Sequence, residues 1–132
     1  MDTVILPDTI LDKNLKLNFE ESTDSEGQVI VHCIYHSSLY YKMIRIWETT
    51  YLVDRDSQHK SKLLYADGIS LFPTWTHIKS NKSVRFSLIF SKLPKSCVLF
   101  DFIEDIPEAN GFKANSIKRN DIDVYQVDFY SS

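Results

Sequence analysis

The chain has 132 residues, of which 43% are hydrophobic and 13% aromatic, and its formal net charge is −3. This length fits one domain, residues 1–132, with enough apolar side chains to fill a core without disulfides. Its 15 Lys and Arg are scattered among 18 Asp and Glu. A protein that binds nucleic acid through phosphate contacts normally carries a basic stripe, so we expect no nucleic-acid binding.

Alternation of apolar and polar residues with period two predicts β-strands along most of the chain. In chain order, the predicted strands lie at 15–19, 29–35, 43–53, 62–65, 84–90, 98–103, 112–117 and 125–129. The clearest runs from Val84 to Phe90, where Phe86 and Leu88 share the face of the two end residues. The alternation in 43–53 is imperfect, which predicts a bulge or a bend there.

Turn-forming residues separate the predicted strands. They lie at 24–27, 54–57, 66–68 and 109–111 and are mostly Asp, Asn, Ser and Gly. No long window has the spacing of an amphipathic helix, and Pro107 limits 104–108 to one helical turn at most. About seven to nine short strands at this spacing predict an all-β domain, a sandwich or a barrel.

The predicted core takes large apolar residues from several strands: Val31, Trp47, Phe86, Leu88, Phe90, Phe100 and Val127. Two cysteines, Cys33 and Cys97, are too few for a disulfide framework. We expect both to be buried, reduced thiols, because free cysteine is among the most buried residue types. The alternative is a disulfide between two sheets, since the order Cys33, Trp47, Cys97 is loosely that of immunoglobulin domains.

The histidines do not form a chelating motif. His32 and His36 have the spacing of a zinc-binding pair on a helix, but the residues around them predict a strand. Four residues span about 13 Å along a strand, too far for both rings to bind one ion. Neither cysteine has a second cysteine nearby, so the sequence predicts no zinc site.

Acidic residues gather in two places, and these are the candidates for calcium binding. One is Asp54 with Asp56, and the other is the acidic run within 101–108. Neither has the alternating ligands, the glycine and the terminal glutamate of an EF-hand loop. The pair Asp54 and Asp56 is typical of a hairpin turn instead. We therefore expect no metal and no cofactor.

No catalytic motif is present. The chain has no G-x-S-x-G elbow, and its three isolated glycines do not make a phosphate-binding loop. We expect no catalytic residues and no enzymatic activity. An enzyme or metal site built from His32, His36, Asp54 or Asp56 remains an alternative, and thermal stabilisation on metal addition would reveal it.

Aromatic residues are the best candidates for contacts with a partner. The segment 70–76 carries Phe72 and Trp75 around a proline and breaks the strand pattern, and Tyr40 and Tyr41 lie in a second irregular stretch. Such rings provide a stacking platform for a sugar or an anchor for a protein partner. The alternative for 70–76 is a loop that folds over one open end of the domain and plugs it.

The start of the chain has no secretory signal. Residues 1–3 lack a basic region, and no apolar stretch follows them. No segment approaches the roughly 20 apolar residues of a membrane span. As written, the chain is expected to be cytoplasmic, although an exported protein whose leader had been removed would look the same.

Five short motifs, in this order, resemble a known kind of domain: Thr50–Asp54, Lys62–Ile69, Phe86–Lys95, Phe100–Glu104 and Gly111–Ile117. Together they are similar to small β-sandwich domains of unknown function that are common in Bacteroidetes bacteria. The resemblance implies an immunoglobulin-like antiparallel β-sandwich of about 7–9 strands with a non-catalytic accessory role. Those domains often have a leader and stand beside an enzyme domain. The sequence as written shows neither, so we expect any partner to be a separate chain.

The sequence thus predicts a non-catalytic interaction or scaffolding module that binds a protein partner, or itself, through an edge strand or the aromatic loop. The alternative is a carbohydrate or small-ligand binder that uses Tyr41, Phe72 and Trp75. An exposed apolar patch would favour the first function, and exposed coplanar rings would favour the second.

Overall fold

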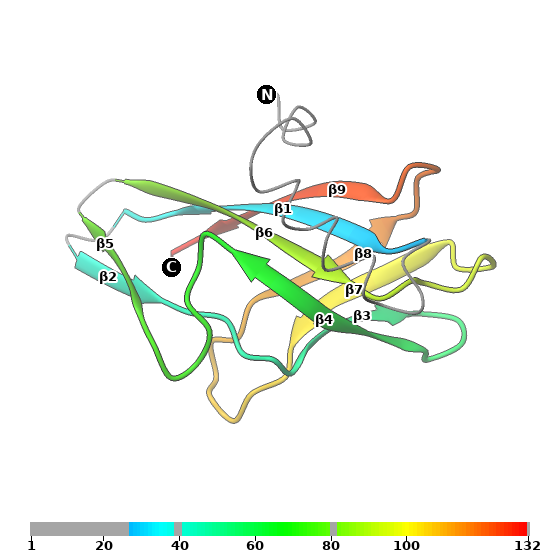
Figure 1. Ribbon diagram of the computed structural model, residues 1–132, viewed down its shortest axis with the longest axis horizontal. Helices are drawn as coiled ribbons and strands as arrows, with labels where there is room; N and C mark the ends of the chain where they lie inside the picture. Colours follow the sequence, from blue (N-terminus) through cyan, green and yellow to red (C-terminus); the bar gives the residue numbers. More distant parts are fainter. Residues whose placement is uncertain (1–26, 39–40, 80–81, 132) are drawn as a thin grey trace.

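The computed structural model describes residues 27–38, 41–79 and 82–131 (Figure 1). Its strands are β1 (Val29–His36), β2 (Tyr41–Ile44), β3 (Thr50–Asp54), β4 (Lys60–Asp67), β5 (Thr76–Lys79), β6 (Ser83–Phe90), β7 (Leu99–Glu104), β8 (Lys113–Lys118) and β9 (Val124–Tyr130). There is no helix in this part of the chain, so the predicted all-β class is confirmed. The predicted strand at 15–19, most of the predicted turn at 24–27, and Tyr40 lie outside the described residues.

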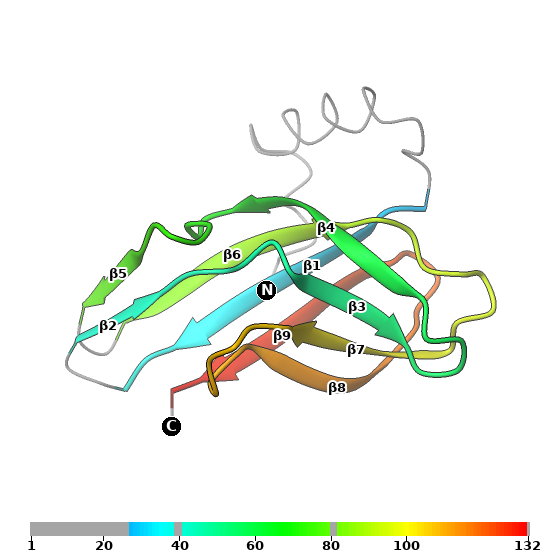
Figure 2. The same ribbon diagram turned by 90° about the horizontal axis from the view of Figure 1, so that it is seen from below.

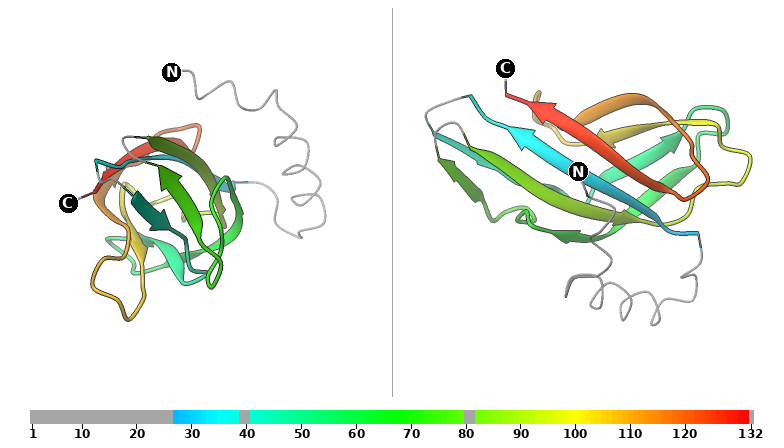
Figure 3. Two further views of the ribbon diagram at one scale, coloured as in Figure 1. Left: turned by 90° about the vertical axis from the view of Figure 1, so that its left-hand side faces the viewer. Right: turned by 90° about the horizontal axis from the view of Figure 1, so that it is seen from above.

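Seven of the strands form one strongly curved sheet in the order β8-β7-β3-β4-β6-β1-β9, and β2 pairs with β5 in a small second sheet. The curvature brings the two ends of the large sheet together, so that the sheet is nearly closed on itself (Figures 2 and 3). All neighbours in it are antiparallel except β1 and β9, which are parallel. The sheet is therefore mixed, where the sequence predicted only antiparallel pairing.

The strand predicted at 43–53 is two strands that belong to different sheets. β2 ends at Ile44, the chain bends, and β3 begins at Thr50, whose hydroxyl donates to the carbonyl of Trp47 at 2.7 Å. The imperfect alternation indicated this bend. β5 was not predicted from the sequence, because it has only four residues and, among the described strands, pairs only with β2.

The core lies inside the curved sheet and is lined by alternate residues of its strands. Five predicted core residues are at most 3% exposed: Val31, Phe86, Leu88, Phe90 and Phe100. The prediction was wrong for Trp47, which is only half-buried because it stands beyond the sheet, in the bend between β2 and β3. Val127 is only partly buried and packs against the core.

Both cysteines are free and buried, Cys33 in β1 and Cys97 before β7. The predicted state of two buried thiols is therefore confirmed over the inter-sheet disulfide. Burial raises the pKa of both thiols, so that they stay protonated at neutral pH. They are packing residues of the core rather than reactive groups.

The two end strands of the sheet, β8 and β9, follow each other in the chain but form no ladder with each other. They lie side by side in two views (Figures 2 and 3). Side chains bridge them from inside: the ring of Phe112, just before β8, lies 4.8 Å from that of Phe129 in β9 and 5.9 Å from that of Tyr35 in β1. These rings form the floor of the candidate site.

Candidate binding site

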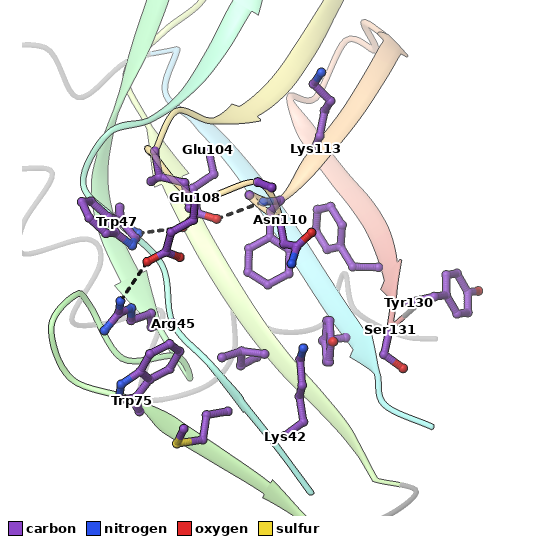
Figure 4. A pocket seen from close by; sticks show the side chains of 18 of the residues that line it. Lys42, Arg45, Trp47, Trp75, Glu104, Glu108, Asn110, Lys113, Tyr130 and Ser131 are labelled. Atoms are coloured by element: carbon purple, nitrogen blue, oxygen red, sulfur yellow. Dashed lines mark hydrogen bonds and ion pairs between the residues drawn. The ribbon is translucent and has the colours of Figure 1, made fainter. Parts of the chain in front are cut away.

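A pocket of about 670 Å³ opens at one end of the curved sheet (Figure 4). One wall is β2 with the bend that follows it, another is the loop between β7 and β8, and the third is the end of β9. Tyr35, Phe112 and Phe129 contribute to its lining from the core side. The mouth of a barrel-like sheet is a common place for a binding site, because the strand ends surround a cavity that side chains leave partly unfilled.

The guanidinium of Arg45 is the centre of the aromatic wall of this pocket. It lies 3.7 Å from the ring centroid of Trp75 and 4.5 Å from that of Phe72. The ring of Trp47 stacks on Phe72 with centroids 3.9 Å apart. A cation over aromatic faces is attracted by their negative π-surfaces, and this attraction strengthens when water is excluded. The Arg45 side chain is only 12% exposed, so the three rings hold a largely desolvated cation.

A short parallel contact between two chain segments places these side chains. Ile46 pairs with Leu71, and its N–H and C=O bond to Ser70 O and Phe72 N, both at 2.9 Å. Residues alternate across such an extended segment. Ile46 is therefore fully buried in the core, while Arg45 and Trp47 on either side of it reach the aromatic wall.

The loop 70–76 is closed at its neck by hydrogen bonds. The hydroxyl of Thr76 accepts the N–H of Ser70 at 2.8 Å and donates to the hydroxyl of Ser70 at 2.9 Å. Within the loop, Thr74 N donates to Leu71 O at 2.9 Å, and the Phe72–Pro73 peptide bond is cis. The loop thus has a defined shape that presents Phe72 and Trp75 at 44% and 39% exposure.

Glu104, at the end of β7, fixes the pocket wall from behind. It is 7% exposed, and its carboxylate accepts the N–H groups of Trp47 at 3.0 Å and of Phe112 at 2.9 Å. Burial raises the pKa of Glu104, and the two backbone donors oppose that rise. Gly111 allows the close approach, because a Cβ there would lie 2.6 Å from the carbonyl oxygen of Glu104.

The rim of the pocket is polar. Lys42 points inward from β2, and Lys113, Asn110 and Glu108 come from the loop and the start of β8 (Figure 4). Glu108 reaches Arg45 with an oxygen 3.4 Å from its guanidinium. The pocket therefore combines an apolar floor with charges of both signs at its edge.

The structure brings together two of the four residues predicted to bind a partner. Phe72 and Trp75 share the Arg45 guanidinium. Tyr41 is apart from them on β2, where it is 53% exposed and its hydroxyl contacts the ring of His77. Tyr40 lies outside the described residues. Sequence analysis missed Arg45, although its alternation with Ile46 and Trp47 is a visible strand-like signal.

The residues of the alternative metal or enzyme site do not meet. His32 Nδ1 bonds to the hydroxyl of Ser87 at 2.7 Å, and burial lowers the pKa of His32. Asp54 caps its own turn, where its carboxylate accepts the Ser57 hydroxyl at 2.6 Å and the Asp56 N–H at 3.0 Å. Within residues 27–38, 41–79 and 82–131, no three His, Cys, Asp or Glu side chains come together in an arrangement that suits a metal ion.

Comparison of the chain with protein-family models, with curated proteins and with solved structures finds no match. In the part of the chain that the structure describes, no helix has the length and apolar character needed to cross a membrane. The function is therefore inferred from the residues of the site alone.

Proposed function

We propose that this domain is a non-catalytic interaction module that binds a protein partner through an exposed aromatic patch. The aromatic patch consists of Phe72 and Trp75 on the loop before β5 together with Met43 of β2, which lines the same pocket as Trp75. Their side chains are 37–44% exposed, which is high for large apolar residues. Grouped exposed apolar side chains with a polar rim are typical of protein-interaction sites.

The observation that carries this proposal is the packing of Arg45 against Trp75 and Phe72. Trp, Tyr and Arg are the residues most often found at the energetic centre of protein interfaces. Here the rings are held in place before any partner arrives, because Arg45 and Trp47 pack against them from behind. A preorganised anchor loses little conformational freedom on binding, which favours affinity.

A carbohydrate or small polar ligand is the second candidate, and the pocket beside Trp75 is the observation that favours it. Its rim provides the amide of Asn110 and the ammonium groups of Lys42 and Lys113, which suit hydroxyl groups. A sugar platform needs free ring faces, however. Phe72 stacks on Trp47, and Arg45 occupies a face of Trp75, so the rings fit a sugar less well than a protein partner.

The test is capture of binding partners by the wild-type domain and by a double variant, Phe72→Ala with Trp75→Ala. A second double variant, Val98→Ala with Ile122→Ala, is the matched control, because these side chains are 58% and 64% exposed and lie outside the patch. We expect the patch variant to lose partners that the control variant keeps. Equal capture by both variants would contradict the proposal, and glycan binding that depends on Trp75 would favour the second candidate.

We also propose that the domain has an immunoglobulin-like fold. An immunoglobulin-like domain of the kind common in Bacteroidetes is consistent with nine short strands that enclose one apolar core. The end strands β8 and β9 are a second possible docking element, since strand edges offer unpaired backbone groups. An experimental structure of a complex would distinguish binding at an edge from binding at the patch.

A further inference from the structure

The acidic side chains that line the pocket differ in how strongly hydrogen bonds and ion pairs hold them. Glu104 is buried and uses both carboxylate oxygens for backbone N–H groups. Asp128 faces the ring of His36, with 3.7 Å between Oδ2 and Nε2. Glu108 is different: it is 54% exposed on the loop between β7 and β8, and its one ion pair among the described residues is the contact with Arg45 at 3.4 Å.

The cationic groups of the pocket are not fully paired with acidic groups. Lys42 and Lys113 line the pocket, and within the described residues neither forms an ion pair. Arg45 makes only two long hydrogen bonds, to Glu108 at 3.4 Å and to the carbonyl of Pro73 at 3.3 Å, and its buried Nε has no partner in the described structure. A guanidinium has five N–H donors, and leaving them unmet in a desolvated position is unfavourable.

These observations have a common explanation. A carboxylate bound by Arg45 at normal hydrogen-bond distance would interact with the guanidinium more strongly than Glu108 does. Charge-assisted hydrogen bonds are shortest and strongest when both groups are held in place. The aromatic rings already fix the guanidinium plane. Glu108 is half-exposed, and its carboxylate oxygen lies 3.4 Å from the Arg45 guanidinium, at the long end of the hydrogen-bond range. It therefore satisfies the guanidinium donors poorly.

We infer that the pocket binds a carboxylate of the partner, and that Glu108 occupies the place of that carboxylate in the free protein. The partner's apolar groups would then lie over Tyr35, Phe112 and Phe129, and Lys42 and Lys113 would strengthen the attraction from the rim. This inference rests on the proposed function, because the carboxylate belongs to an extended segment of the partner protein. It adds that Glu108 competes with the partner.

The chain offers a direct spectroscopic probe of this site. It has two tryptophans, and both Trp47 and Trp75 line the pocket. Fluorescence excited selectively in tryptophan, and the two indole N–H signals in an NMR spectrum, therefore report on this site. No label is needed.

The experiment titrates the full chain with two probes of nearly equal shape, N-acetyl-leucine and N-acetyl-leucinamide, of which only the first has a carboxylate. We expect the acid to shift both indole signals with a Kd on the order of millimolar, typical of so small a ligand, and the amide to leave them unchanged. A third probe, the amide of N-acetyl-glutamic acid at its α-carboxyl group, carries its charge on the side chain. The tighter of the two acids shows whether a chain end or an acidic side chain is bound.

Substitutions then test the role of Glu108. Glu108→Gln removes the competing charge from an exposed loop, and we expect it to tighten the binding of N-acetyl-leucine about tenfold, the size of one charge-assisted hydrogen bond. Arg45→Gln should abolish binding. The control is Arg55→Gln, because Arg55 forms an ion pair of the same length, 3.4 Å, with Asp101 outside the pocket. If Arg45→Gln does not fold, the gain in affinity for N-acetyl-leucine in Glu108→Gln still tests the inference.

Three results would overturn the inference: no indole shift with either acid, equal shifts with acid and amide, or unchanged affinity in Glu108→Gln. These failures differ from failure of the proposed function. If partner capture depends on the aromatic patch while the acids do not bind, the partner uses the patch without a carboxylate. If capture does not depend on the patch, the proposed function itself is wrong.

Discussion

Oε2 of Glu104 accepts the backbone N–H of Trp47 at 3.0 Å, although 57 residues separate the two in the chain. The other oxygen of the same carboxylate accepts the N–H of Phe112. One buried side chain thus joins the bend after β2 to the loop before β8. The two segments are neighbouring walls of the pocket, so the shape of the site depends on Glu104.

The first prediction concerns this link. Glu104→Ala leaves two inward-facing N–H groups without acceptors, and we expect a loss of about 2–4 kcal/mol in the free energy of unfolding. Trp47 should also become more exposed to water, which a red-shifted fluorescence emission of the folded protein would report. Glu48→Ala is the control, since Glu48 is exposed beside Trp47. Equal stability of the two variants would mean that the carboxylate does not hold the walls.

Gly111 gives the second prediction. A Cβ at this position would lie 2.6 Å from the carbonyl oxygen of Glu104, so Gly111→Ala must displace backbone. We expect a loss of about 1–3 kcal/mol, the range found for overpacking, measured by chemical unfolding. Asn110→Ala changes an exposed neighbour and should stay within about 0.5 kcal/mol. A neutral Gly111→Ala would show that the loop can move away from β7 at little cost.

The third prediction concerns pH and the turn after β3. Hydrogen bonds from the Ser57 hydroxyl and the Asp56 N–H lower the pKa of Asp54. Because the folded-state pKa is below the unfolded one, the Asp54 carboxylate stabilises the fold above the unfolded pKa, and this contribution is lost as pH falls through the folded value. Ser57→Ala removes the larger cause of the shift.

We therefore expect Ser57→Ala to cost about 1 kcal/mol at pH 7 and less at pH 3, measured by urea unfolding at both values. Asp121→Asn, an exposed position in the loop before β9, is the comparison and should alter both values little. The same loss at both pH values would show that the contribution of Ser57 to stability does not depend on the charge of Asp54.

The fourth prediction tests the core. Leu88, in the centre of β6, is fully buried, and Leu88→Ala should cost about 2–5 kcal/mol in thermal or chemical unfolding. Val98→Ala truncates an apolar residue that is 58% exposed and should cost no more than about 0.5 kcal/mol. Similar losses from both would mean that Leu88 faces away from the core.

Much of the fold could be predicted from local patterns. β6 and β1 could be predicted because they are rich in β-branched and aromatic residues, which favour extended backbone, and because Phe86, Leu88 and Phe90 recur at every second position. The parallel pairing of β1 with β9 could not be predicted, since it joins opposite ends of the described chain. No local signal separates a parallel partner from an antiparallel one.

The candidate site was predictable only in part. The loop with Phe72 and Trp75 stood out because two large rings flank a proline. Their dependence on Arg45 was hidden, because it comes from the contact between Ile46 and Leu71, which are distant in sequence. Trp47 was assigned to the core for its size, but its burial is decided by the bend that takes it out of the sheet.

The parallel pairing of β1 with β9 also affects how the protein is made. β1 is among the first described strands to be synthesised, and β9 is the last. Until β9 has emerged from the ribosome, the edge of β1 that pairs with β9 lacks this partner, so the large sheet is completed only after all the other described strands have been made. Contacts between sequence-distant strands also slow folding, because a long loop must close before they form. The edge of β1 is thus open to other chains in the nascent protein, and a truncation that removes β9 leaves it open permanently.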